Sequence, residues 1–275
     1  MPIPISATII CKNAGEKIRL ALDSIAWCDA IILVDSGSTD NTLQIVHAHP
    51  AAQKITVLAN PWPGYNPQRR FAAEKCPTDW LLMLDADEEC SPALAQELQS
   101  LTDSQLAAVA IFKMPRENYV ARRHVRCWGP DYQTRFIHKA RVDWDPRSLP
   151  EIRTPKPGFT VHKLRHPLLH NRLTPCRPAD FNEGVRQAAY AEELALHLRL
   201  RGKRASFINL LFRPWMTFLK YYLLRGAIWQ GRFGLAIAYK TTIGVMLKYS
   251  ALYGMELSNT ADSAAPETQN AKPQK

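Results

Sequence analysis

A run of apolar residues that ends in two aspartates constrains the fold of this chain more than any other segment. Trp80–Leu84 is uninterruptedly apolar, and Asp85 and Asp87 follow it. Such a run is typical of a strand buried on both faces of a parallel sheet. Open α/β sheets bind ligands outside the carboxyl ends of these strands. Two carboxylates placed there suit a hard cation such as Mg²⁺ or Mn²⁺, and the alternative is an ordinary strand end facing water.

Strand and helix patterns alternate through the first part of the chain. The apolar runs are Ile5–Cys11, Ala30–Val34, Ile55–Leu58 and Trp80–Leu84, and helical stretches separate them. Strands that alternate with helices predict βαβ units and a parallel sheet, so the fold class is α/β. Beyond a helix at Pro92–Leu101, three further β-rich pieces are expected to extend the sheet, namely Val109–Met114, Gln133–His138 and Phe159–His162.

Composition favours a globular protein of the cytoplasm. The chain has 275 residues, 46% of them hydrophobic, which is enough for a sizeable core. Its six cysteines include no Cys-x-x-Cys pair, as expected in a reducing compartment. No signal peptide is expected, because the start of the chain lacks a basic segment followed by an apolar one. No uncharged apolar run reaches the roughly 18 residues typical of a transmembrane helix, so we expect a soluble or peripheral protein.

The positive charge is concentrated in the last third of the chain. The net charge is +10, and no Asp or Glu lies between Leu194 and Met255. Two helical segments, 206–230 and 233–253, carry aromatic residues interleaved with Lys and Arg, and Gly231–Gly234 is expected to break them. This pattern suits helices in an anionic membrane interface, and the alternative is a hairpin packed on the catalytic domain or on a second subunit.

Several motifs, taken in order, carry a resemblance to a known family. The motifs are Thr8–Asn13, Val34–Asp40, Gly64–Arg69, Leu84–Glu88, Pro130–Phe136 and Leu164–His170. With these motifs the chain resembles the family 2 glycosyltransferases, which have the GT-A fold, and is most similar to the short glucosyltransferases of bacterial lipopolysaccharide core assembly. The resemblance implies a Rossmann-like, mostly parallel sheet flanked by helices. We expect a GT-A catalytic domain at 1–178, a basic, aromatic helical appendage at 179–255 that packs on it and faces the membrane, and a disordered tail at 256–275.

The resemblance implies a site for a nucleotide-sugar. Asp35 would accept a hydrogen bond from uracil or ribose, and Arg69 would neutralise phosphate; a turn-forming aspartate and a solvated helix face are the alternatives. Asp40 is expected to cap the following helix rather than bind a ligand directly. The expected nucleotide-sugar-binding residues are Asn13, Asp35, Gln68, Arg69 and Asp85.

The metal would be held chiefly by Asp87, while Asp85 would contact the ribose, or the metal through water. The resemblance also implies a C-terminal histidine ligand, which is His170, with His166 as a competitor and a purely structural role for either as the alternative. Glu88 and Glu89 are interpreted as helix-start or solvent-facing residues.

An inverting transfer needs a carboxylate that deprotonates the acceptor hydroxyl. Two acids fit this role, Asp131 and Glu151, and the sequence leaves the choice open. Glu151 follows Pro150, where relatives usually have histidine, so the chain keeps the acid but departs from the motif beside it.

We therefore expect a metal-dependent, inverting glycosyltransferase that moves a hexose, glucose from UDP-glucose, to a lipopolysaccharide inner-core or related cell-envelope glycan. Its expected partners are a UDP-hexose, a lipid-linked acceptor and an anionic inner-membrane surface, with no nucleic acid. The expected location is the cytoplasm, peripheral on the inner face of the cytoplasmic membrane. Two alternatives are a nucleotidyltransferase acting on a sugar phosphate and a non-enzymatic basic protein that binds nucleic acid or membrane.

Overall fold

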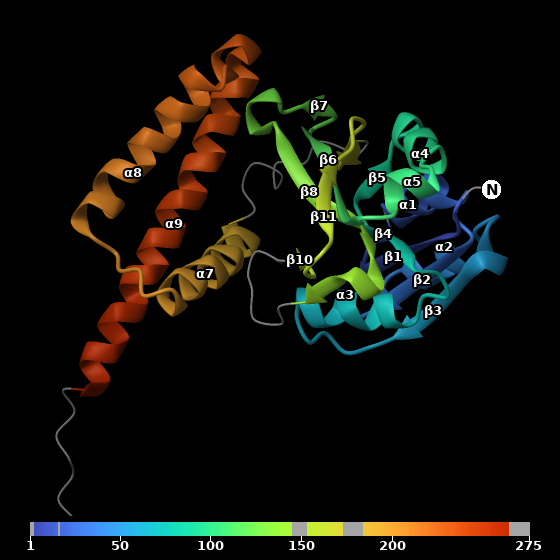
Figure 1. The fold of residues 1–275 in the computed structure, drawn as a ribbon. Helices are drawn as coiled ribbons and strands as arrows, with labels where there is room; N and C mark the ends of the chain where they lie inside the picture. The colour runs from blue at the N-terminus through green and yellow to red at the C-terminus, as the bar shows by residue number, and fades with distance from the viewer. Residues whose placement is uncertain (1–2, 16, 145–152, 173–183, 264–275) are drawn as a thin grey trace, which may run out of the picture. The chain divides into compact units, whose positions relative to one another are not determined.

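The computed structural model describes residues 3–15, 17–144, 153–172 and 184–263. The chain forms two compact units, residues 1–180 and residues 181–275. Unit 1 holds a large sheet with helices on both faces, and unit 2 is helical (Figure 1).

In the described part of unit 1, ten strands form one sheet, and two short strands pair separately. The main sheet has the order β3-β2-β1-β4-β8-β6-β12-β5, with β7 and β11 also paired to β6. Its strands are β1 (Ile5–Cys11), β2 (Ala30–Asp35), β3 (Ile55–Ala59), β4 (Trp80–Asp85), β5 (Glu88–Cys90), β6 (Val109–Val120), β7 (Arg123–His124), β8 (Asp131–His138), β11 (Thr160–Lys163) and β12 (Leu168–His170). The separate pair is β9 (Val142–Trp144) and β10 (Arg153–Pro155).

The four strands predicted from apolar runs form the parallel half of the sheet. β1 lies between β2 and β4, and all seven of its residues are buried. The register pairs Cys11 with Asp35 on one side and Ile10 with Asp85 on the other. Both acids therefore lie at the same edge of the sheet, at the carboxyl ends of the strands. This edge is where open α/β sheets bind ligands.

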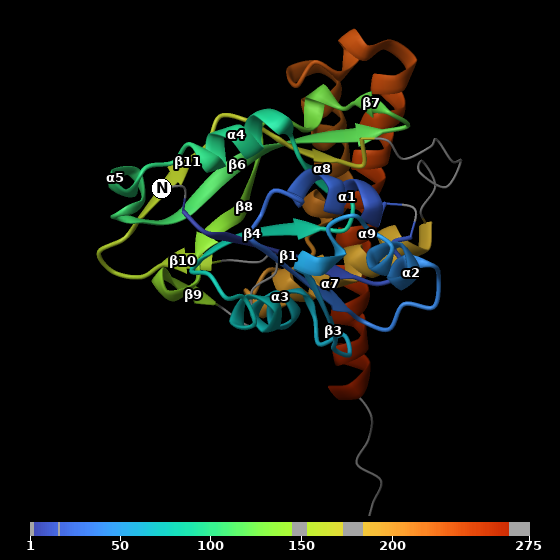
Figure 2. The same ribbon diagram turned by 90° about the vertical axis from the view of Figure 1, so that its right-hand side faces the viewer.

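Helices cover both faces of this sheet because its strands are apolar on both sides. One core cluster packs α1 (Ile18–Ile25) and α4 (Pro92–Gln99) on one face, and a second packs α3 (Tyr65–Glu74) on the other (Figure 2). Two shorter helices, α2 (Thr42–His47) and α5 (Asp103–Leu106), contribute Val46 and Leu106 to the first cluster. The α4 prediction is confirmed, since the Ser91 hydroxyl accepts a hydrogen bond from the Leu94 N–H.

The rest of the sheet is mixed. β8 is antiparallel to both β4 and β6, while β12 is parallel to β6 and antiparallel to β5. The interpretation of Glu88 and Glu89 as helix-start or solvent residues was wrong. They form β5, and both are buried, because β5 pairs with the distant β12. The α/β prediction itself is confirmed, as are the strands expected between 107 and 165.

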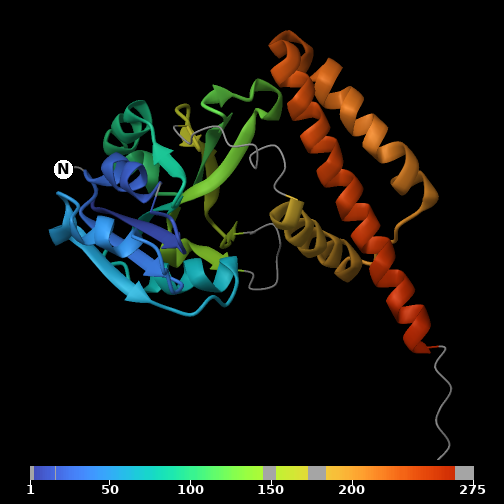
Figure 3. The same cartoon turned by 180° about the vertical axis from the view of Figure 1, so that it is seen from behind.

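Unit 2 consists of α7 (Gly184–Leu200), α8 (Phe207–Leu219), a π-helical turn (Lys220–Leu224), a 3₁₀ turn (Ala227–Gln230) and α9 (Gly231–Ser263). α7 and α8 both pack against α9 (Figure 3). α9 includes 256–263, which the sequence analysis assigned to the disordered tail; 264–275 lie outside the described residues. None of the described helices has the length and apolarity needed to cross a bilayer.

The break between the two apolar segments was predicted at Gly231–Gly234. Gly231, with a φ of 60°, does separate the 3₁₀ turn from α9, but the helix continues through Gly234. The chain also turns earlier, at Gly226, whose φ of 72° is in the left-handed region that favours glycine. Gly234 lies inside α9 and serves a different purpose. A Cβ there would lie 1.8 Å from the Ala227 carbonyl oxygen, so only glycine permits this close approach.

Candidate active site

Asp85 ends β4 between two arginines. One carboxylate oxygen accepts a hydrogen bond from Arg69, on α3, and the other accepts from Arg135, on β8. Burial raises the pKa of Asp85, but the two guanidinium groups outweigh burial, and the net pKa lies below its usual value. Asp85 is therefore an ionised acid whose charge is already neutralised by the protein.

Glu88 joins this pair to the neighbouring strands. Its side chain is fully buried, and its Oε1 accepts hydrogen bonds of 3.0 Å from both Arg135 and Arg116. Its Oε2 accepts the backbone N–H of Asp85 at 3.1 Å. A buried carboxylate with this number of donors is a structural centre of the site rather than a solvent residue.

Asp131 begins β8 and is held by four donors. The Arg116 guanidinium contacts its Oδ2 through Nη2 at 2.8 Å and Nε at 2.9 Å. The same oxygen accepts from the Asn118 amide at 3.2 Å, and Oδ1 accepts from Gln133 at 2.6 Å. The β6–β8 register explains this, since it pairs Asp131 directly with Arg116. Arg116 thus links the carboxylates of Glu88 and Asp131.

Asp87 faces a histidine and a lysine. Its Oδ2 lies 3.5 Å from His170 Nε2 and 3.6 Å from Lys17 Nζ. Burial raises the pKa of Asp87, but the hydrogen bond and charge of His170, together with Lys17, bring the pKa well below the usual range. The structure therefore brings together the two residues predicted to hold a metal, Asp87 and His170.

His170 is oriented from behind by Asn118. The His170 Nδ1 lies 2.9 Å from Asn118 Oδ1, which can only accept, so Nδ1 carries the hydrogen. Nε2 lies 3.0 Å from the amide nitrogen of Asn171 and 3.5 Å from Asp87 Oδ2. Metal-binding histidines are usually held in this way, by an oxygen that accepts a hydrogen bond from the other ring nitrogen. Since Asn118 also contacts Asp131, one side chain positions both groups.

A metal fits this pair only with help from a substrate. Among the residues that the structure describes, no three His, Cys, Asp or Glu side chains converge as a metal site. Mg²⁺ is commonly bound by one or two carboxylates together with substrate phosphates. Asp87 and His170 suit such a partial set, whereas both oxygens of Asp85 are already engaged by arginines.

Asp35 and Asn13 build the loops beside this edge. The Asp35 Oδ2 accepts the backbone N–H groups of Gly37 at 3.0 Å and Ser38 at 2.9 Å, as in a turn-forming aspartate. The Asn13 Oδ1 accepts the Thr39 N–H at 2.8 Å. These contacts fix the loop after β2 against the loop after β1.

Asp40 and Gln68 have local structural contacts. Asp40 accepts the N–H of Thr42, the first residue of α2, so it binds the helix start as expected, and the hydroxyl of Thr42 lowers the pKa of Asp40. Gln68 is fully buried, and its amide nitrogen donates to Ser36 Oγ at 2.9 Å and to the Asn60 carbonyl at 3.1 Å. It therefore ties α3 to the ends of β2 and β3.

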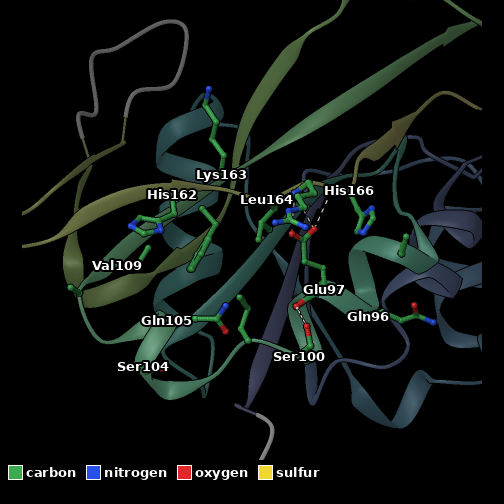
Figure 4. Close-up of a pocket in the computed structure, with 15 residues that line it drawn as sticks. Gln96, Glu97, Ser100, Ser104, Gln105, Val109, His162, Lys163, Leu164 and His166 are labelled. Carbon is green, nitrogen blue, oxygen red and sulfur yellow. Dashed lines mark hydrogen bonds between the residues drawn. The ribbon is translucent and has the colours of Figure 1, made fainter.

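The other predicted residues lie apart or outside the described structure. Glu151 falls outside the described residues. The backbone N–H of His166 donates to Glu97 at 3.0 Å, and its side chain lines a groove of about 780 Å³ between α4 and β11 (Figure 4). The acids at the strand ends do not line this groove, and neither do the side chains that contact them. The structure thus brings His170, and not His166, to Asp87.

Sequence reasoning missed several members of the site. Glu88, Arg116, Asn118 and Lys17 were not selected, although all of them contact a selected acid. Arg135 was quoted in a motif without a role, yet it contacts Asp85. The strand register supplies these contacts, and no local spacing signals them.

Comparison with known families decides the class of this protein. Residues 6–159 match the model of the family described as glycosyl transferase family 2. The chain belongs to glycosyltransferase family 2. The GT-A expectation and the glycosyltransferase expectation are confirmed, and the nucleotidyltransferase and non-enzymatic alternatives are set aside.

Curated relatives of this family 2 glycosyltransferase include a lipopolysaccharide enzyme. The lipopolysaccharide core biosynthesis glycosyltransferase LpsC of Rhizobium meliloti (strain 1021) is 29% identical over 241 residues, 83% of each chain. An uncharacterized glycosyltransferase of Rickettsia bellii (strain RML369-C) is 42% identical over 102 residues, 37% of this chain and 33% of that protein. The matched segment thus spans about a third of the Rickettsia protein.

The solved structures that match this chain have lower sequence identity than these relatives. S. aureus TarS 1-349 is 14% identical, with a TM-score of 0.46 over 90% of this chain and 91% of that chain. The glucosyl-3-phosphoglycerate synthase from Mycobacterium tuberculosis, in complex with Mn²⁺, UDP and glucosyl-3-phosphoglycerate, is 16% identical, with a TM-score of 0.42 over 70% of this chain and 79% of that chain.

Proposed function

We propose that this family 2 glycosyltransferase is a metal-dependent, inverting hexosyltransferase that moves glucose from UDP-glucose to a lipopolysaccharide inner-core sugar or a related cell-envelope glycan. The observation that carries the proposal is the arrangement of four acids at the carboxyl edge of the sheet. Asp85 and Glu88 are neutralised by arginines, Asp131 is fixed by donors, and Asp87 faces His170.

The donor would bind along the ends of β1, β2 and β4. The loops held by Asn13 and Asp35 would receive the nucleoside, and Gln68 would keep the α3 end in place from inside. Arg69 would be shared between Asp85 and the donor phosphates, because a guanidinium can contact two anions at once. Asp85 would contact the ribose while it holds Arg69 in position.

Asp87 and His170 would hold Mg²⁺ or Mn²⁺ together with the donor diphosphate. The bound cation would offset the negative charge that develops on the leaving diphosphate. The Lys17 ammonium group lies 3.6 Å from the Asp87 carboxylate, so one positive charge lies beside this acid without the metal. Asn118 holds the His170 ring so that Nε2 faces Asp87.

Asp131 is the favoured general base, with Glu151 as the alternative. A base must lie within hydrogen-bond reach of the acceptor hydroxyl, and Asp131 is fixed beside the acids that would bind the donor. Its carboxylate is partly exposed, so a hydroxyl can reach it. Arg116 and Asn118 would hold the carboxylate in the direction of the attacking oxygen.

The proposed acceptor is a lipid-linked glycan at the inner face of the cytoplasmic membrane. Two features support it: the similarity to a lipopolysaccharide core glycosyltransferase along most of the chain, and the stretch of ten cationic and no acidic residues between Leu194 and Met255. An anionic surface would attract such a segment.

Release of UDP from UDP-glucose, with and without Mn²⁺, tests the donor and the metal. We expect turnover that chelation abolishes, and an Asp87→Ala enzyme with a kcat at least about 100-fold lower. Asp79→Ala is the matched control, because Asp79 precedes β4 at the opposite end of the same strand and is exposed. Full transfer by Asp87→Ala would rule out the metal assignment.

Separate Asp131→Asn and Glu151→Gln enzymes test the base. The variant that lacks the base should lose kcat by roughly 10²–10⁴-fold and retain its affinity for the donor. If both variants kept their kcat, neither acid would be the base.

A further inference from the structure

Unit 2 exposes one continuous apolar helix face. The outward residues of α8 recur at the spacing of a single helix side, and all of them are large, apolar and exposed. We call this set the α8 outer face: Phe207, Ile208, Leu211, Phe212, Trp215 and Met216. Soluble proteins rarely expose so large a contiguous apolar patch unless it binds something.

Packing against α9 does not account for this face. α8 contacts α9 through its other side, where Pro214 is buried and Phe218 stacks on Tyr239 at 5.2 Å between ring centroids. Arg213 also turns toward α9, with its guanidinium 5.6 Å from the Tyr249 ring centroid. The hairpin of α8 and α9, visible in Figure 3, therefore forms without using the α8 outer face.

Cationic side chains and an exposed tryptophan follow this face in the turns after α8. The π-helical turn that follows α8 places Lys220 and Arg225 over the Tyr221 ring, at 5.9 and 5.2 Å from its centroid. At the tip of the hairpin, Leu224 is 84% exposed and Trp229 is 87% exposed. Tyrosine and tryptophan with Lys and Arg beside them are typical of helices at a membrane–water interface.

We propose that the α8 outer face enters the headgroup region of a membrane that contains anionic lipid, with the axis of α8 parallel to the membrane surface. α8 has 13 residues, too few to span a bilayer, but an amphipathic helix of this kind can lie in the interface. The proposal names the contact that would bring the enzyme to a lipid-linked acceptor, and in this respect it rests on the proposed function.

Charge favours a lipid surface over a second copy of the chain. Unit 2 has no Asp or Glu between Leu194 and Met255, so two identical faces would bring like charges together. Anionic headgroups would instead neutralise Lys220, Arg225 and their neighbours.

Vesicle co-sedimentation of the full chain tests the proposal. The wild type should bind vesicles of phosphatidylethanolamine with phosphatidylglycerol and bind pure phosphatidylcholine weakly, and salt should weaken the binding. A Phe212→Gln/Trp215→Gln variant should lose at least about tenfold in partition coefficient. Both side chains are exposed, so circular dichroism and the melting temperature should match the wild type.

Two controls distinguish insertion of the α8 outer face from non-specific hydrophobic binding. Val161→Gln removes an exposed apolar side chain from unit 1 and should leave vesicle binding unchanged. Trp215→Phe should still bind, but the quenching of tryptophan fluorescence by brominated lipid should fall, because the side chain that enters the lipid is gone.

The proposal would be overturned if the Phe212→Gln/Trp215→Gln variant still bound vesicles, or if the wild type did not bind anionic vesicles. It would also be overturned if the wild type were a dimer in analytical ultracentrifugation and this variant a monomer. The last would make the face a subunit interface. A chain that binds vesicles but does not release UDP from UDP-glucose would refute the proposed function and leave the membrane contact standing.

Discussion

Replacing Glu88 with glutamine tests whether the arginine network holds the site together. The substitution keeps the shape of the side chain and removes a negative charge that is fully buried. Two charge-assisted hydrogen bonds are affected, the 3.0 Å contacts from Arg116 and Arg135. A third contact, from the Asp85 N–H, meets the other oxygen.

The cost follows from these three contacts. Glutamine leaves the two arginines without the buried negative charge that they share, and removing one partner of a buried ion pair costs about 3–5 kcal/mol. The amide nitrogen of glutamine must also face a donor in either orientation, and a buried unsatisfied donor costs about 1–3 kcal/mol. Arg135 keeps its ion pair with Asp85, and Arg116 keeps its ion pair with Asp131, so the loss of stability is limited. We expect about 3 kcal/mol, near the lower bound for breaking a buried ion pair.

Thermal unfolding of the full chain, followed by near-UV circular dichroism, measures this loss. For a unit of this size, 3 kcal/mol lowers the melting temperature by about 6–12 °C. Glu89→Gln is the matched control on the same strand. Glu89 forms an ion pair with Arg172 at 2.8 Å, and the Arg172 side chain is 38% exposed, so we expect at most about 1 kcal/mol. Equal melting temperatures for the two variants would refute the reasoning.

Five further substitutions, in three experiments, have outcomes that the structure predicts. Gly234→Ala should destabilise unit 2 by about 1–3 kcal/mol, because its Cβ would clash with a backbone oxygen, whereas Gly244→Ala, which meets nothing within 4 Å, should stabilise α9 by up to about 1 kcal/mol; thermal melts compare them. Burial raises the pKa of the Cys11 thiol from about 9 to about 12, so it should react with a thiol reagent at pH 8 only after unfolding. Since the unfolded thiol ionises first, Cys11 should make stability fall as the pH rises above about 9, and Cys11→Ala should reduce that fall. Asp85→Asn should lower the melting temperature and keep most of the affinity for Mn²⁺. Asp87→Asn should keep the melting temperature and lose most of the affinity for Mn²⁺. Thermal melts measure the first quantity, and calorimetric titration with Mn²⁺ in the presence of UDP measures the second.

The parallel half of the fold could be predicted because its signal is local. A strand buried on both faces must be apolar throughout, and Trp80–Leu84 shows this without reference to any other part of the chain. The placement of acids at the ends of β2 and β4 follows from the same reasoning, since parallel strands end at one edge. Asp35 and Asp85 could therefore be selected before any register was known.

The second half of the site could not be predicted because its contacts are distant in sequence. Glu88 pairs with His170 across β5 and β12, and Asp131 pairs with Arg116 across β8 and β6. An acid directly after a strand resembles a solvent residue until the arginines that surround it are known. Burial of Glu88 is thus a property of the register, not of its neighbours in the chain.

The two glycines of the break predicted in unit 2 differ for a related reason. Gly231 marks a break, since its φ is 60° and α9 begins there, whereas α9 passes through Gly234. A glycine inside a helix can mark a turn or a close approach, and only the tertiary structure separates the two. The approach to the Ala227 carbonyl requires Gly234, while the left-handed φ of Gly226 makes the turn.

Asp85, at the end of β4, and Asp87 have different surroundings although only Ala86 separates them. Each oxygen of Asp85 meets a guanidinium, so further positive charge there would gain little and would be repelled by Arg69 and Arg135. Asp87 instead meets Lys17 Nζ at 3.6 Å and His170 Nε2 at 3.5 Å, distances that leave its carboxylate open to a closer cation. In the proposed function, the motif of two acids would therefore act as one structural anchor and one binding group. The arginines, which the spacing of the acids does not reveal, decide which acid takes which role.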